Sequence, residues 1–155
     1  MAKHVFEVKA HVLAAPNLVF NELKSARNFE ALFSAVRGLS PQATGEFGGR
    51  CIPAVLFMRE DLHLKILEAA APERFTVQLT DEYNVVTYAF SIAAAGKGSA
   101  VACRVECCTR SESGASWPSE RLARMMQRQD GAIAERLKDY VERAGVADAR
   151  SVSVC

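Results

Sequence analysis

The chain has 155 residues, of which 50% are hydrophobic and 24% are charged. This composition fits one globular domain and excludes disordered, fibrous and coiled-coil chains. Its 19 basic and 18 acidic residues leave a formal charge of +1. No overall basic excess therefore argues for binding to nucleic acid or to an anionic membrane.

The chain shows no sign of export or of a membrane span. No stretch approaches the roughly 18 consecutive apolar residues that mark a bilayer-crossing helix. The N-terminus lacks a signal-peptide apolar core, because charges recur at Glu7 and Lys9. The 5 cysteines form no C-x-x-C pair, which favours a reduced compartment. We therefore expect a cytoplasmic protein.

The first segment alternates between apolar and polar residues. A period of two with one wet face predicts a half-buried strand, here about His4 to Leu13. Pro16 then suits the first turn of a helix, where its missing N–H needs no partner. Two short apolar faces follow, separated by a break at Ser25–Asn28. They predict two short helices rather than one long helix.

Turn signals become frequent from Gly38 to Arg110, and short apolar or alternating runs lie between them. Spacings of about 8–12 residues between such runs are typical of an antiparallel meander. The runs are Val36–Thr44, Cys51–Met58, Leu62–Ala69, Phe75–Thr80, Val85–Ala94 and Val101–Thr109. With the first strand they predict seven strands, and the last two should form a long hairpin around a glycine turn.

The last element is an amphipathic helix predicted from Pro118 to Ala144, about 27 residues or roughly 40 Å long. Its apolar side chains recur at steps of three and four: Leu122, Met125, Met126, Ile133, Leu137, Tyr140, Val141 and Ala144. Gly131 lies in its middle, where it relieves crowding, permits a bend or is simply tolerated. Gly145 is a natural stop. We expect a single domain over residues 1–145 and a flexible tail over residues 146–155.

The other face of this helix is charged. Six basic and five acidic side chains are interleaved along it, Asp130 and Arg136 among them. Such a mixture is typical of a solvated helix face. We therefore expect both of these side chains to lie in water.

Two segments carry a family resemblance. Val8–Phe20 looks like a strand that leads into a proline-initiated helix, and Tyr88–Ile92 with Val101–Glu106 looks like a final hairpin. With the order of elements over residues 4–144, they resemble the START-like superfamily. That group includes Bet v 1-like proteins, polyketide cyclase/dehydrase proteins (SRPBCC) and lipid-transfer proteins.

The resemblance implies an α+β helix-grip fold. In such a fold a seven-stranded, curved antiparallel sheet surrounds the long C-terminal helix, and two short helices close one end. It also implies a hydrophobic cavity between the sheet and that helix.

The candidate ligand-binding residues are those expected to line this interior. They are Tyr88, Phe90, Cys103, Met125, Met126, Gln129 and Ile133. The Tyr88 phenol needs a hydrogen-bond partner when it is buried, and a ligand is one such partner. Gln129 falls on the apolar stripe of the helix. There its amide contacts a ligand, bonds the backbone or lies at a half-exposed flank.

No catalytic residue and no metal site can be assigned. No nucleophile–base pair and no acid pair stands at a usable spacing. Cys107 and Cys108 are neighbours on a strand, so their side chains point to opposite faces and do not converge on a metal. We therefore predict neither a metal nor a cofactor.

The sequence favours a binding module for a small hydrophobic ligand, such as a lipid, an isoprenoid or an aromatic polyketide-like compound. Two alternatives stay open. One is a polyketide cyclase/dehydrase-type enzyme, in which Tyr88 or Gln129 handles protons or carbonyls. The other is a protein-interaction domain like the co-chaperone activators. A homodimer is also left open.

Overall fold

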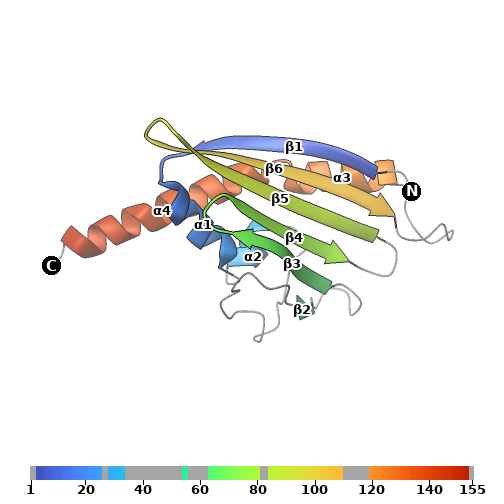
Figure 1. Ribbon diagram of the computed structural model, residues 1–155, viewed down its shortest axis with the longest axis horizontal. Helices are drawn as coiled ribbons and strands as arrows, with labels where there is room; N and C mark the ends of the chain where they lie inside the picture. The colour runs from blue at the N-terminus through green and yellow to red at the C-terminus, as the bar shows by residue number, and fades with distance from the viewer. Residues whose placement is uncertain are drawn as a thin grey trace.

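The computed structural model describes residues 3–25, 28–33, 54–55, 63–80, 84–109 and 119–153. The helices and strands are β1 (Lys3–Val12), α1 (Pro16–Lys24), α2 (Phe29–Leu32), β2 (Ala54–Val55), β3 (His63–Ala70), β4 (Arg74–Thr80), β5 (Asn84–Ala95), β6 (Gly98–Thr109), α3 (Ser119–Asp130) and α4 (Ile133–Ser153). The strands form one antiparallel sheet in the order β1-β6-β5-β4-β3-β2. The helices lie on one face of that sheet (Figure 1).

The predicted α+β architecture is therefore confirmed, but the predicted number of strands is not. The described residues contribute 6 strands to the sheet. The remaining expected strand, near Val36–Thr44, lies outside the described residues.

Alternation along the strands builds the core. In β4, β5 and β6 every second side chain is buried and its neighbours are more exposed. We call the buried side of the sheet the inner face. Strand pairing sets Tyr88 opposite Val105 and Phe90 opposite Cys103, so all four share this face. The period-two pattern predicted these strands, because such a pattern separates a wet face from a dry one.

The long β5–β6 hairpin was predicted from its glycine turn, and it is present. Gly96 has a positive φ of 56°, a conformation that favours glycine. Gly98 lies so close to the Val12 carbonyl of β1 that a side chain there would collide with it. The buried Ser99 hydroxyl donates a 2.7 Å hydrogen bond to the Ala14 carbonyl, which fixes the chain as it leaves β1.

The two short helices after β1 were also predicted correctly. α1 begins at Pro16 and buries Val19, Phe20 and Leu23. The break between α1 and α2 is held by the buried Asn28. Its amide donates hydrogen bonds of 2.9 Å to both the backbone carbonyl and the carboxylate of Glu22.

The prediction of one uninterrupted C-terminal helix is wrong. α3 ends at Asp130, and α4 starts at Ile133 after a turn at Gly131 and Ala132. A Cβ atom on Gly131 would collide with the Gln127 carbonyl oxygen, so the glycine permits a close approach of backbone at the break. This geometry matches the bend that was one of three interpretations of Gly131.

The predicted helix end at Gly145 is wrong as well. The backbone of α4 stays helical through Gly145 to Ser153, and this part of the helix projects past the sheet (Figure 1). A glycine inside a helix costs only about 1 kcal/mol relative to alanine, so it does not by itself end one. The domain boundary drawn at residue 145 stays a prediction.

The core lies between the inner face and the helices. α3 packs against β1 and β6, while α4 packs mainly against β1, α1 and α2. Burial is incomplete where α3 crosses β1. There Phe6, Val8, Ala123 and Met125 pack against the core but remain partly exposed, and we call this set the β1–α3 edge. None of the helices in the described ranges has the length and apolar character needed to cross a bilayer.

Candidate ligand-binding site

The structure brings most of the predicted site residues onto or against the inner face. Tyr88 and Cys103 are fully buried on adjacent strands, and Phe90 lies directly opposite Cys103. From the helices, Met126 and Ile133 are buried in the same core, and Met125 lies at the β1–α3 edge. These six side chains form an apolar interior with one phenol.

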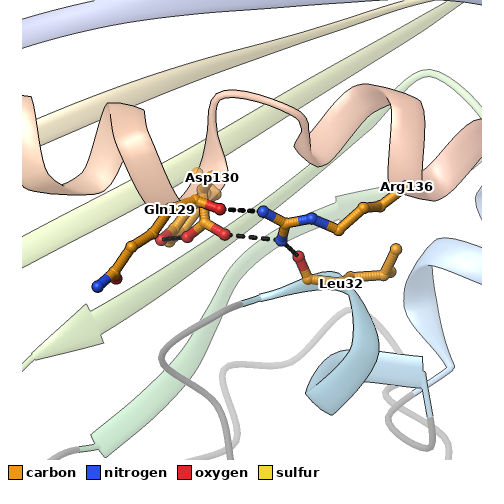
Figure 2. Close-up of polar contacts among 5 residues, drawn as sticks. Leu32, Gln129, Asp130 and Arg136 are labelled. Atoms are coloured by element: carbon orange, nitrogen blue, oxygen red, sulfur yellow. Dashed lines mark hydrogen bonds and ion pairs between the residues drawn. The ribbon is translucent and has the colours of Figure 1, made fainter.

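Gln129 is the exception. Its side chain is exposed and in Figure 2 its amide points away from Asp130 and Arg136. Of the three interpretations of Gln129, the structure favours a position at the exposed flank of the apolar stripe. The next residue, Asp130, is fully buried in its place. It continues the spacing of four set by Leu122 and Met126, which are also buried, and that spacing is the only sequence signal that points to it.

A polar cluster sits inside this interior (Figure 2). The Tyr88 hydroxyl donates a 2.7 Å hydrogen bond to Oδ2 of Asp130. Nη1 of Arg136 donates to Oδ1 of the same carboxylate at 2.8 Å and to the Leu32 carbonyl at 2.6 Å. Nη2 of Arg136 donates to the Gln129 carbonyl. The cluster thus joins the centre of the sheet to the α3–α4 break and to α2.

The expectation that Asp130 and Arg136 lie in water is wrong. The Asp130 side chain has 0% exposure, and that of Arg136 has 28%. An unpaired charge would be costly at such a depth, and the paired guanidinium offsets that cost only because its geometry is good. Residue type does not distinguish this aspartate from its solvated neighbours, and the partners that stabilise its charge come from other elements.

The environment keeps the Tyr88 phenol protonated. Burial raises the pKa of Tyr88 well above its usual value, and the charge and hydrogen bond of Asp130 raise it further. Tyr88 therefore acts here as a hydrogen-bonding group rather than as a base. Its hydroxyl hydrogen is committed to Asp130, while the phenol oxygen retains acceptor capacity.

Aromatic rings enclose the phenol on the α2 side. Phe33 meets the ring of Tyr88 edge-on, with ring centroids 4.9 Å apart. Phe33 also lies edge-on to Phe29 at 5.5 Å and to Phe90 at 6.1 Å. Edge-to-face pairs at these distances are favourable beyond their buried area. They hold α2 against the inner face and fix the position of Tyr88.

Two buried thiols of β6 are expected to make the protein sensitive to alkaline pH. Burial raises the pKa of Cys103 far above its usual value, with smaller contributions from the charges of Asp130 and Glu7. Burial, with the charge of Glu106, raises the pKa of Cys107 from 9.0 to about 12. The folded state thus keeps protons that the unfolded chain loses. Stability should be complete below about pH 9 and fall as the pH rises towards 12.

Urea unfolding at about pH 9 and pH 10 measures this effect, which should be about 1 kcal/mol for each thiol. Cys107→Ala should reduce the loss by that amount. An equal loss in the variant and in the parent protein would contradict the assignment.

The described residues hold no group of three or more His, Cys, Asp or Glu side chains that could bind a metal ion. Asp130 is instead bound to Tyr88 and Arg136, and both partners are hydrogen-bond donors. The carboxylate of the cluster is thus used for hydrogen bonds with Tyr88 and Arg136.

No family model and no curated protein matches the chain. Solved structures do match it. Ara h 8.0201 is 17% identical with a TM-score of 0.64, over 92% of this chain and 99% of that chain. The Zhui aromatase/cyclase from a Streptomyces species is 11% identical with a TM-score of 0.68, over 92% and 95%. A START superfamily protein from Mycobacterium smegmatis is 10% identical with a TM-score of 0.64, over 91% and 99%.

These likenesses define the class of fold. The protein has the START/Bet v 1-like fold, as its first strand, proline-initiated helix and final hairpin predicted. At 10–17% identity the likeness concerns the fold alone.

Proposed function

We propose that this protein binds a small hydrophobic molecule between the inner face of the sheet and α3. The observation that carries the proposal is the Tyr88–Asp130 pair, a fully buried polar group in an otherwise apolar interior. A core built for stability alone gains little from a buried ionic group, whereas a binding site needs a few polar atoms to orient its ligand.

The β1–α3 edge supports the proposal. Phe6 and Met125 continue the apolar interior to the surface from opposite sides, one from β1 and one from α3. Methionine adapts to ligands of different shape, because its side chain is flexible and polarizable. Ligand would enter here, where these partly exposed apolar side chains reach the surface.

The proposed ligand class is a lipid, an isoprenoid or an aromatic polyketide-like compound. The fold is shared with a protein titled aromatase/cyclase and with one titled as a START superfamily protein. Apolar burial would supply most of the binding free energy, at about 25 cal/mol per Å².

Native mass spectrometry of the protein purified under mild conditions tests the proposal. A co-purifying small molecule, or saturable uptake of an environment-sensitive dye that lipids displace, is the expected result. Met125→Trp should reduce binding because it fills the β1–α3 edge. The matched control is Arg124→Trp, the neighbouring exposed position on α3, which should bind normally.

Two other results would count against simple binding. Absence of uptake, with both variants behaving like the parent protein, would refute the proposal. Chemical conversion of the bound compound would instead indicate an enzyme of the cyclase/dehydrase type.

A further inference from the structure

The Tyr88 hydroxyl presents a hydrogen-bond acceptor to the interior, while its own hydrogen is already donated. Tyr88 has a single hydroxyl hydrogen, and it is given to Asp130. The Arg136 guanidinium directs its bonds to oxygens of Asp130, Leu32 and Gln129. Among the described residues, no donor is paired with the Tyr88 oxygen, which is fully buried.

Among the described residues, the cation of the cluster lies on one side of the carboxylate. Tyr88 bonds one oxygen of the Asp130 carboxylate and Arg136 bonds the other. Figure 2 shows Arg136 between Asp130 and Leu32, on the α2 side of the carboxylate. The positive charge thus faces α2 and the surface, whereas the phenol and the carboxylate face the sheet. A second anion placed beside Tyr88 would lie closer to the Asp130 carboxylate than to the Arg136 guanidinium. The two negative charges would repel each other strongly, because the effective dielectric constant of the interior is low.

Together these observations select among hydrophobic ligands. The acceptor capacity of the buried Tyr88 oxygen favours a ligand that donates a hydrogen bond over a ligand that has no donor. The buried carboxylate disfavours a ligand that is itself a carboxylate. We infer that the ligand is an uncharged apolar molecule with a hydroxyl group, an alcohol or a phenol, which donates its hydrogen to the Tyr88–Asp130 pair. This inference rests on the proposed function and adds the chemical class of the ligand.

The test compares three probes that share one alkyl chain: decanol, decyl methyl ether and decanoate. Each is titrated against a bound dye at neutral pH. Decanol should bind about tenfold more tightly than the ether, because only decanol donates a hydrogen bond. Decanoate should bind at least tenfold more weakly than decanol.

An apolar replacement of the cluster provides the matched variant. The triple change Tyr88→Phe, Asp130→Leu and Arg136→Met removes all three polar groups together, which buried ionic clusters often tolerate without loss of stability. It should bind decanol and the ether equally well. The control, Lys138→Met with Glu142→Leu, removes an ion pair on α4 and should keep the preference for decanol.

The outcomes separate the two claims. If none of the three probes binds, the proposed function itself fails. If all three bind and the parent protein prefers the ether or decanoate, or prefers neither, the ligand class is wrong while the binding function stands. A preference for decanol that persists in the triple variant also overturns the inference, because the preference then has another source. If the triple variant does not fold, the ranking in the parent protein still decides.

Discussion

Replacing Arg136 with methionine is expected to cost about 3–5 kcal/mol of folding free energy. The change removes the guanidinium that is paired with the fully buried Asp130 carboxylate and keeps the Tyr88 hydroxyl. It also removes the donor to the Leu32 carbonyl, which ties α4 to α2. Equilibrium urea unfolding monitored by circular dichroism measures the loss.

Lys138→Met is the matched control on the same helix. Lys138 is 29% exposed, close to the 28% of Arg136, and it also forms a short ion pair, with Glu142 at 2.6 Å. Its partner is 26% exposed, whereas Asp130 has 0% exposure. Water can solvate Glu142 when Lys138 is removed, so the control should lose less than about 1 kcal/mol.

A second substitution should restore part of the folding free energy that Arg136→Met loses. Asp130→Asn in the Arg136→Met background removes the buried negative charge. The amide oxygen of asparagine can still accept the hydrogen bond of the Tyr88 hydroxyl. The double variant should therefore be more stable than Arg136→Met alone, although it carries one more substitution. Equal and small losses for Arg136→Met and Lys138→Met, or no rescue by asparagine, would show that the cluster contributes little to folding.

Phe33→Ala is expected to cost about 3–5 kcal/mol. Phe33 has 0% exposure and lies edge-on to Phe29, Tyr88 and Phe90. Its removal leaves a cavity between α2 and the inner face, and the loss includes both the buried area and the lost ring contacts. The midpoint of thermal or urea unfolding reports the change.

Two further variants separate the effect of the Phe33 ring contacts from the general cost of removing a phenylalanine. Phe33→Leu keeps most of the volume and should cost about 1–2 kcal/mol. Phe6→Ala, at the half-exposed β1–α3 edge, should cost less than about 2 kcal/mol because that ring is already partly in contact with water. A loss for Phe33→Ala no larger than the loss for Phe6→Ala would mean that the aromatic contacts do not anchor α2.

Local patterns were enough to predict most of the fold. The patterns at Val85–Ala94 and Val101–Thr109 predicted β5 and β6, because a strand exposes its two faces to different surroundings. Pro16 predicted where α1 begins. At Gly131 the sequence allows a bend but does not require a break in the C-terminal helix. A helical glycine that alanine could replace cannot be told from one that has no room for a Cβ atom by sequence alone. At Gly131 the nearby Gln127 carbonyl oxygen shows that there is no such room.

The sequence predicted the apolar residues of the candidate site but not its buried ion pair. Tyr88, Phe90 and Cys103 follow from strand parity alone. Gln129 is exposed, whereas Asp130, which the charge pattern places on a solvated face, is fully buried. A continuous helix would place position 129 between Met126 and Ile133, whereas α3 buries the side of Leu122, Met126 and Asp130 and ends at Asp130.

The sequence by itself determined the order of the elements, the parity of each strand and the apolar residues of the interior. These properties depend on neighbours a few positions away, and hydrophobic periodicity records them. The tertiary structure alone decided the state of the charged residues. Tyr88, 42 positions away, and Arg136 across the helix break converge on Asp130 and stabilise its charge in the interior. A charge can be buried when partners from other parts of the chain pair with it, and a local sequence pattern contains no information about those partners.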